Sequence, residues 1–264
     1  MTILDEIIAW KRKEVDHYKL LRPLNILERD INRDAVPCSL QKYIRSKEHS
    51  GIIAEFKRKS PSKGFINEEA DPAVVCSGYR KAGASALSVL TDTKFFAGSN
   101  YDLEIARRYN QCPILRKDFT IDEYQVVEAR SIGADAILLI AEVLTKNELT
   151  TLYELAKGLN LEVLFEIHDE ASIDKLPADA NIIGINSRNL CNFEVSIEHT
   201  MRLAGKLPKG AIKIAESGID SASTIVELRR AGFDGFLIGE RFMREPDPGL
   251  ACKSFIEEIN AISI

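Results

Sequence analysis

The chain has 264 residues, of which 45% are hydrophobic and 28% are charged, and its formal net charge at pH 7 is -5. This composition describes a globular protein with a large core. It offers neither a basic face for nucleic acid nor the roughly 18 consecutive apolar residues of a membrane span, so we expect no nucleic-acid partner and no membrane.

The N-terminus and the cysteines predict the compartment. Asp5, Glu6 and Lys11 lie where a secretion signal would be apolar. Five cysteines are scattered without metal-ligand spacing: Cys38, Cys76, Cys112, Cys191 and Cys252. Free thiols in a reducing, cytoplasmic compartment are the expectation. The histidines form no ligand pair, and we interpret His168 as a solvated loop residue, so no metal is predicted.

The first fifty residues predict a helical segment. Thr2 and Asp5 form a helix start, and an apolar stripe follows it: Ile3, Leu4, Ile7 and Ile8. We expect this helix to pack over one end of the domain that follows.

Short apolar runs then recur, with roughly 20–35 residues between their ends, about the length of a strand–loop–helix–loop unit. The runs are Ile52–Ala54, Ala86–Leu90, Pro113–Leu115, Ala136–Ile140, Leu161–Phe165, Ile182–Ile185, Ile212–Ala215 and Gly235–Ile238. Several are apolar on both faces, which is typical of parallel strands covered by helices.

Helix starts fall between these strands. Asp71 and Asp247 each precede a proline, as an N-cap precedes an N1 proline. Thr120 with Glu123, and Thr145 with Glu148, predict capping boxes.

Alternating strands and helices fit either an open doubly wound sheet or a closed barrel. Three similar junctions, at 82–90, 132–140 and 231–239, indicate one repeated strand–helix unit. An open sheet would be expected to carry one glycine-rich fingerprint, and none is present. We therefore predict an α/β protein: a single (βα)8 TIM barrel over residues 51–264, with residues 1–50 as an N-terminal helical extension packed on it.

Polar residues end several predicted strands. Barrel enzymes keep their chemistry at these carboxyl ends. The residues are Glu55, Lys57, Lys117, Glu166, Asn186, Arg188 and Glu216. One pair such as Glu55 and Lys57 could be a structural ion pair. Convergence of several acids and amines from alternate strands favours a catalytic site instead.

The last two strand ends carry glycines where backbone amides can approach a ligand. Ser217 and Gly218 follow one strand, and Gly239 and Glu240 follow the next. The loops after the seventh and eighth strands of such barrels commonly bind phosphate. Together with Lys57 they predict a phosphorylated substrate.

Seven segments resemble the indole-3-glycerol-phosphate synthase family of tryptophan biosynthesis. They are AEFKRKSPSKG (54–64), SVLTD with FFAGS (88–99), LRKDF (115–119), EIHDE (166–170), GINSRNL (184–190), AESGI (215–219) and LIGERFM (237–243). They occur in order from about residue 50 to the end, and the helical extension is also typical of that family.

The resemblance implies a carboxy-lyase that uses no metal or organic cofactor. Such an enzyme converts 1-(2-carboxyphenylamino)-1-deoxyribulose 5-phosphate to indole-3-glycerol phosphate, CO2 and water. The resemblance places the general acid of ring closure on Lys117 and a second acid/base on Glu166. Lys57 is implied as an auxiliary acid, and the resemblance does not decide which lysine acts at which step.

The resemblance also assigns substrate contacts. Glu55, Asn186 and Glu216 would orient the substrate, with Ser217 beside them. Arg188 and Ser60 are candidates for its carboxylate, because a guanidinium offers paired donors. Phe96, Phe119 and Leu138 would line the ring pocket. The phosphate would bind Lys57 and the amides near Gly218, Gly239 and Glu240, with only the amide of Glu240 facing it.

Three alternatives remain at this point. A phosphoribosylanthranilate isomerase needs a Cys/Asp pair where this chain offers lysines. An aldolase-like Schiff base on Lys117 would leave a covalent adduct. A non-catalytic phosphate-binding barrel need not keep both Lys117 and Glu166. We expect a monomer.

Overall fold

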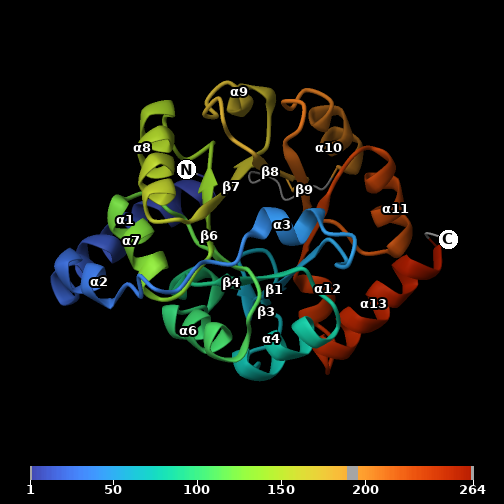
Figure 1. Cartoon of the computed structure of the whole chain (residues 1–264), viewed down its shortest axis with the longest axis horizontal. Helices are drawn as coiled ribbons and strands as arrows, with labels where there is room; N and C mark the ends of the chain where they lie inside the picture. Colours follow the sequence, from blue (N-terminus) through green and yellow to red (C-terminus); the bar gives the residue numbers. More distant parts are fainter. Residues whose placement is uncertain (1, 189–195, 263–264) are drawn as a thin grey trace.

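A closed barrel of eight parallel strands forms the centre of the molecule (Figure 1). The computed structural model describes residues 2–188 and 196–262. The barrel strands are β1 (Ile52–Phe56), β4 (Ala86–Leu90), β5 (Ile114–Lys117), β6 (Ala136–Ile140), β7 (Glu162–Ile167), β8 (Ile182–Asn186), β9 (Ile212–Glu216) and β10 (Gly235–Ile238). Strand β1 pairs with β4 on one side and with β10 on the other, which closes the ring.

All eight predicted strands are present, and closure of the ring excludes the open doubly wound sheet. Strands β4, β6 and β10 have the predicted bounds, whereas the other predicted strands end one or two residues early. Strand β5 runs to Lys117 rather than Leu115, and β7 runs to Ile167 rather than Phe165. The polar residues Lys117 and Glu166 therefore belong to the strands themselves, which fixes where their side chains point.

Helices surround the barrel in the colour order of the chain (Figure 1). Those that follow barrel strands are α4 (Pro72–Lys81), α5 (Thr93–Phe96), α6 (Asn100–Tyr109), α7 (Glu123–Ser131), α8 (Lys146–Gly158), α9 (Glu170–Ile173), α10 (Ile197–Ala204), α11 (Ala222–Arg230), α12 (Glu240–Met243) and α13 (Pro248–Ile262). A small hairpin of β2 (Lys59–Ser60) and β3 (Gly64–Phe65) follows β1.

The predicted helix starts are correct except for one. Asp71 caps α4, and Thr145 forms a capping box with Glu148. The capping box predicted for Thr120 with Glu123 is wrong. Asp122 caps α7 instead, because its carboxylate is one residue from the helix and accepts the amide of Tyr124.

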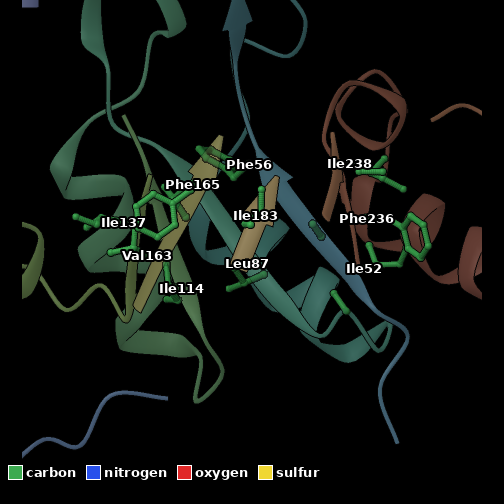
Figure 2. Close-up of a cluster of buried hydrophobic side chains, with 14 of the residues drawn as sticks. Ile52, Phe56, Leu87, Ile114, Ile137, Val163, Phe165, Ile183, Phe236 and Ile238 are labelled. Carbon is green, nitrogen blue, oxygen red and sulfur yellow. The ribbon is translucent and has the colours of Figure 1, made fainter. Parts of the chain in front are cut away.

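Two apolar layers stabilise the barrel. The outer layer packs the strands against the helices and includes Ile52, Leu87, Phe165 and Phe236 (Figure 2). The inner layer fills the barrel itself with Ile53, Ala86, Leu115, Ala136, Leu138, Ile140, Leu164, Ile182, Ile212, Ile214 and Leu237. Because side chains alternate along a strand, each strand supplies both layers.

The N-terminal segment covers both ends of the barrel. It contains α1 (Ile3–Leu21), α2 (Leu24–Asp30) and α3 (Leu40–Arg45). Ile3, Leu4 and Ile7 of α1 line the cavity at the carboxyl ends of the strands. Leu40 and Ile44 of α3 join the inner layer. The sequence predicts cover at one end only, and the division of the chain at residue 50 stays a prediction.

Other expectations concern thiols and membranes. Cys38, Cys76, Cys112 and Cys252 are free thiols, and Cys191 lies outside the described residues. None of the helices in the described part of the chain has the length and hydropathy to cross a membrane.

Candidate active site

A cavity of about 860 Å³ opens at the carboxyl ends of the strands. Helix α1 and residues from the strands and their following loops form its walls. All fifteen predicted site residues line it: Glu55, Lys57, Ser60, Phe96, Lys117, Phe119, Leu138, Glu166, Asn186, Arg188, Glu216, Ser217, Gly218, Gly239 and Glu240. The barrel thus brings together residues that are far apart in the sequence.

Lys117 lies at the centre of the charged groups. Its Nζ donates to Glu166 Oε2 at 2.8 Å and lies 3.5 Å from Glu216 Oε2. Strands β5, β7 and β9 carry these three residues, so all point into the barrel mouth. Asn186 of β8 donates to Glu166 Oε1 at 3.2 Å. A second pair, Lys57 and Glu55, has an Nζ–Oε1 distance of 2.6 Å.

Burial and charge set the protonation states of this group. Burial would lower the pKa of Lys117, but the carboxylates of Glu166 and Glu216 outweigh it and raise that pKa. Burial would raise the pKa of Glu166, but the charges of Lys117 and His168 lower it to about 2. Burial, and then the negative charge of Glu166, raise the pKa of Glu216 to about 8. Near neutral pH the cluster therefore holds an ammonium, a carboxylate and a protonated carboxyl.

Two glycines leave room for the carboxylates. A Cβ on Gly184 would lie 2.1 Å from Glu216 Oε1, and a Cβ on Gly239 would lie 2.5 Å from Glu55 Oε1. Any larger residue would therefore displace an acid. These glycines are needed for close approach of a side chain.

An apolar wall faces the charged group. The rings of Phe96 and Phe119 have centroids 6.1 Å apart, and Leu138 lines the same cavity. At the rim, the Arg188 guanidinium is 3.4 Å from Ser62 Oγ and 4.0 Å from Glu240 Oε2. These long contacts leave its donors available to a ligand.

The loop after β9 has an unusual backbone. Ser217 and Gly218 both have positive φ, 66° and 67°. Such a conformation is costly for serine and is found mainly at functional sites. Glu240, the first residue of α12, has its carboxylate 3.9 Å from Lys63 Nζ at the cavity rim.

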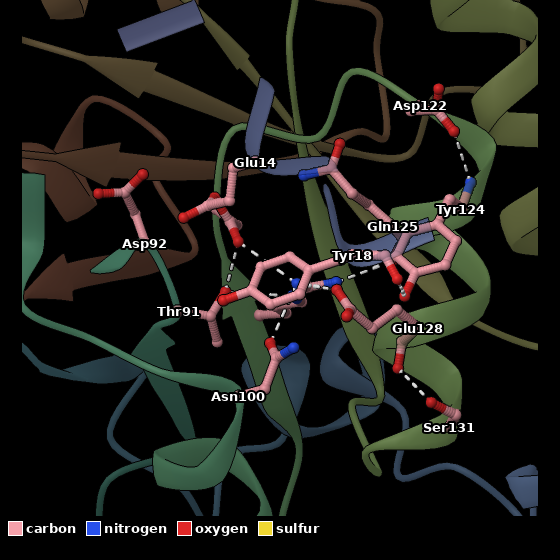
Figure 3. A network of polar contacts seen from close by, with 12 residues as sticks. Glu14, Tyr18, Thr91, Asp92, Asn100, Asp122, Tyr124, Gln125, Glu128 and Ser131 are labelled. Carbon is pink, nitrogen blue, oxygen red and sulfur yellow. Dashed lines mark hydrogen bonds and ion pairs between the residues drawn. The ribbon is translucent and has the colours of Figure 1, made fainter. Parts of the chain in front are cut away.

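Behind the site lies a buried polar network that the sequence analysis missed. Lys11 of α1 is buried and contacts Asp92 Oδ2 at 2.8 Å and Asp118 Oδ1 at 2.9 Å. Arg116 bonds to Glu128 at 2.5 Å and extends the network toward α7. Figure 3 labels Glu14, Thr91, Asp92, Asn100 and Glu128 among the members of this network.

The interpretation of His168 as a solvated loop residue is wrong, because only 12% of its side chain is exposed. Its ring lies 2.9 Å (Nδ1) from Glu142 Oε2 and 3.6 Å (Nε2) from Glu166 Oε1. The sequence offers one signal for this placement: Leu164, Glu166 and His168 share the inward phase of β7.

Within residues 2–188 and 196–262, no group of three or more His, Cys, Asp and Glu side chains could hold a metal ion. The predictions of no metal and no organic cofactor stay predictions.

Comparison with known proteins identifies the family. The family model for indole-3-glycerol phosphate synthase matches residues 4–255. The chain belongs to the indole-3-glycerol phosphate synthase family. The predicted family and its class, a carboxy-lyase of tryptophan biosynthesis, are confirmed.

Named relatives agree with this assignment. An indole-3-glycerol phosphate synthase of Bacteroides thetaiotaomicron is 48% identical over 97% of this chain and 98% of its own length. One of Campylobacter fetus subsp. fetus is 48% identical over 92% of this chain and 95% of its own.

Solved structures support the barrel. A mutant tryptophan synthase alpha-subunit of Pyrococcus furiosus superimposes with a TM-score of 0.60 over 81% of this chain and 99% of its own. The two sequences are 12% identical, so the likeness concerns the fold alone.

Proposed function

We propose that this member of the indole-3-glycerol phosphate synthase family acts at the barrel mouth on 1-(2-carboxyphenylamino)-1-deoxyribulose 5-phosphate. The products are indole-3-glycerol phosphate, CO2 and water. The observation that carries the proposal is the position of Lys117, whose ammonium lies between Glu166 and Glu216 in the cavity. Ring closure requires an acid that protonates the ketone oxygen while the aromatic carbon attacks the ketone carbon.

Lys117 is the general acid of ring closure in this proposal. The surrounding carboxylates keep it protonated until the ketone oxygen accepts the proton. As the ketone oxygen accepts the proton, the substrate carboxylate is lost as CO2 and the ring regains aromaticity. Lys57 lies in the same cavity as an auxiliary acid.

Glu166 is the acid/base of the dehydration. The tertiary hydroxyl leaves as water once the Lys57 ammonium has protonated it, and a proton must then be removed from carbon to complete the indole. An ionised Glu166 can accept that proton, and Asn186 orients it through Oε1. Glu55, Asn186 and Glu216 orient the substrate hydroxyls.

The remaining contacts follow the shape of the cavity. The aromatic ring packs on Phe96, Phe119 and Leu138. Arg188 binds the substrate carboxylate as a paired donor. Ser60 assists it, since its buried Oγ has no hydrogen-bond partner among the described residues.

The phosphate binds at the loops after β9 and β10. Ser217, Gly218 and Gly239, with the amide of Glu240, supply backbone and hydroxyl donors there, and Lys57 supplies charge. The Glu240 carboxylate lies 3.9 Å from Lys63 Nζ and 4.0 Å from the Arg188 guanidinium, which supports a role for its amide alone toward the phosphate.

We further propose that the enzyme is a monomer of the cytoplasm. The free thiols at Cys38, Cys76, Cys112 and Cys252 support a reducing compartment. Light scattering of the purified protein tests the monomer: a dimer mass would contradict it.

The deciding experiment is turnover of the substrate followed by indole fluorescence. Lys117→Met and Glu166→Gln should each lower kcat by about 10²–10⁴-fold. Lys253→Met and Glu257→Gln on α13 are matched controls, because both side chains are largely exposed. Near-normal kcat in either site variant would contradict the assigned role.

The turnover measurement and a borohydride-trapping measurement test two of the alternatives. No turnover by the wild-type protein would favour the non-catalytic barrel. An adduct trapped by borohydride would favour the aldolase-like Schiff base.

A further inference from the structure

His168 lies between two carboxylates at the edge of the site. Its Nδ1 is 2.9 Å from Glu142 Oε2, and its Nε2 is 3.6 Å from Glu166 Oε1. Both ring nitrogens are shielded from solvent. Neither nitrogen has a hydrogen-bond partner among the described residues, so the two carboxylates act on the ring as nearby charges.

Glu142 is itself held in place. Its Oε1 accepts the backbone amide of His168 at 2.8 Å and the hydroxyl of Ser172 at 2.5 Å. These bonds fix the carboxylate in the loop after β6, so its other oxygen faces the imidazole. A carboxylate, an imidazole and a second carboxylate are thus aligned from the rim to the reacting group.

The charge of this arrangement changes during the proposed reaction, and the inference rests on that proposed function. Before ring closure, Glu166 is paired with the Lys117 ammonium at 2.8 Å. After Lys117 has given its proton to the ketone oxygen, the lysine is a neutral amine. Glu166 must then stay ionised in a buried place until it accepts the next proton. A buried carboxylate without a cation is costly.

We propose that His168, oriented by Glu142, is a positioning residue that keeps Glu166 anionic and in place once Lys117 has become neutral. The cation is the imidazolium, whose Nδ1 lies 2.9 Å from Glu142 and whose Nε2 lies 3.6 Å from Glu166, so it acts on both carboxylates by its charge. It does not touch the substrate and transfers no proton itself. Its effect falls on the dehydration, the step that needs Glu166 as a base.

The surroundings of His168 favour the charged form. Burial lowers its pKa, but Glu142, Glu166 and Glu216 outweigh burial and raise it. On the α10 side, the ring Nε2 of His199 contacts the His168 carbonyl oxygen at 2.9 Å. The acids acting on the imidazole are Glu142 in the loop after β6, Glu166 of β7 and, once it ionises, Glu216 of β9, while the Lys117 ammonium of β5 contacts the same Glu166 carboxylate. Asp169, the chain neighbour of His168, is a fourth acid.

The test measures kcat and KM across pH 6 to 9.5 for four proteins. In the wild type, kcat should fall as pH rises through the raised pKa of His168, because the neutral imidazole cannot balance Glu166. His168→Asn should have a kcat about 10–100-fold lower, a KM within about twofold, and no such fall with pH. Glu142→Gln should keep the fall but move it to lower pH, because His168 loses the neighbour that favours its charge.

His17→Asn, on the exposed face of α1, is the matched control and should behave as the wild type. The double variant of His168 and Glu142 should match His168→Asn, because Glu142 acts through His168. Two outcomes overturn the inference. His168→Asn could keep the wild-type kcat and pH profile. Alternatively, it could lose kcat together with a raised KM and a lower Tm while Glu142→Gln keeps the wild-type pH profile. Absence of turnover in the wild type would instead refute the proposed function.

Discussion

Lys11 Nζ of helix α1 lies 2.9 Å from Asp118 Oδ1. Asp118 directly follows Lys117, the last residue of strand β5. The same ammonium contacts Asp92, which caps the helix that carries Phe96. A single lysine of the N-terminal segment thus joins two strand ends of the site. The extension is coupled to the catalytic face by charge as well as by apolar packing.

Lys11→Met should destabilise the fold by about 3–5 kcal/mol, because it takes the ammonium from buried Asp92 and leaves Asp118 with Arg116 alone. Denaturant unfolding followed by far-UV circular dichroism measures this free energy. The matched control is Lys19→Met on the same helix, whose pair with Asp122 is partly exposed. That change should cost about 0–1 kcal/mol. Equal losses in the two variants would contradict the buried ion cluster.

Gly184→Ala should lower kcat in a protein that still folds. The new Cβ would lie 2.1 Å from Glu216 Oε1, so Glu216 must leave its position beside Lys117. We expect a loss of about 10- to 100-fold, since small misplacements at a site cost rates of this order. Gly158→Ala is the control, because nothing lies within 4 Å of its Cβ. Unchanged kcat in Gly184→Ala would show that Glu216 has no role at that position.

KM should rise with pH in the wild type. Above the raised pKa of about 8, Glu216 ionises and adds negative charge to the cavity. The phosphate of the substrate is already a dianion there, because its second pKa is about 6. Repulsion then weakens binding as pH increases. Glu216→Gln cannot ionise, so its KM should stay level from pH 7 to 9.5; a parallel rise in the variant would refute this origin.

Arg188→Ala should raise KM by about 10–100-fold, because a hydrogen bond to a charged group contributes about 1.5–3 kcal/mol. Its present contacts, Ser62 and Glu240, are too long to compete with a substrate carboxylate. Arg188→Lys keeps the charge without the paired donors, so its KM should lie between those of the wild type and Arg188→Ala. A change confined to kcat would mean that Arg188 does not bind the carboxylate.

The barrel could be predicted from sequence because its signals are local and repeated. Apolar runs with helix starts between them gave all eight strands. The period of two then placed Glu55, Lys117, Glu166 and Glu216 on inward faces, since alternation continues to the end of each strand. Their convergence follows from closure of the ring and needs no knowledge of their neighbours.

Other features depend on contacts between distant segments. Lys11 looks like a solvated lysine until its neighbours are known, although its spacing of four from Ile7 and Val15 places it on the buried face of α1. Gly184 reads as an ordinary strand glycine, because its purpose depends on Glu216 of the next strand. The partner of His168, Glu142, comes from another loop.

The pairing of β1 with β10 joins the first and last strands of the ring, Ile52 with Phe236 and Ala54 with Ile238. Glu55 and Gly239 meet across this seam. A chain released from denaturant can therefore form most of its helices and strands before β1 pairs with β10. Until that pairing forms, the active site is incomplete. During refolding, recovery of turnover should consequently lag behind recovery of ellipticity, because turnover requires closure of the barrel.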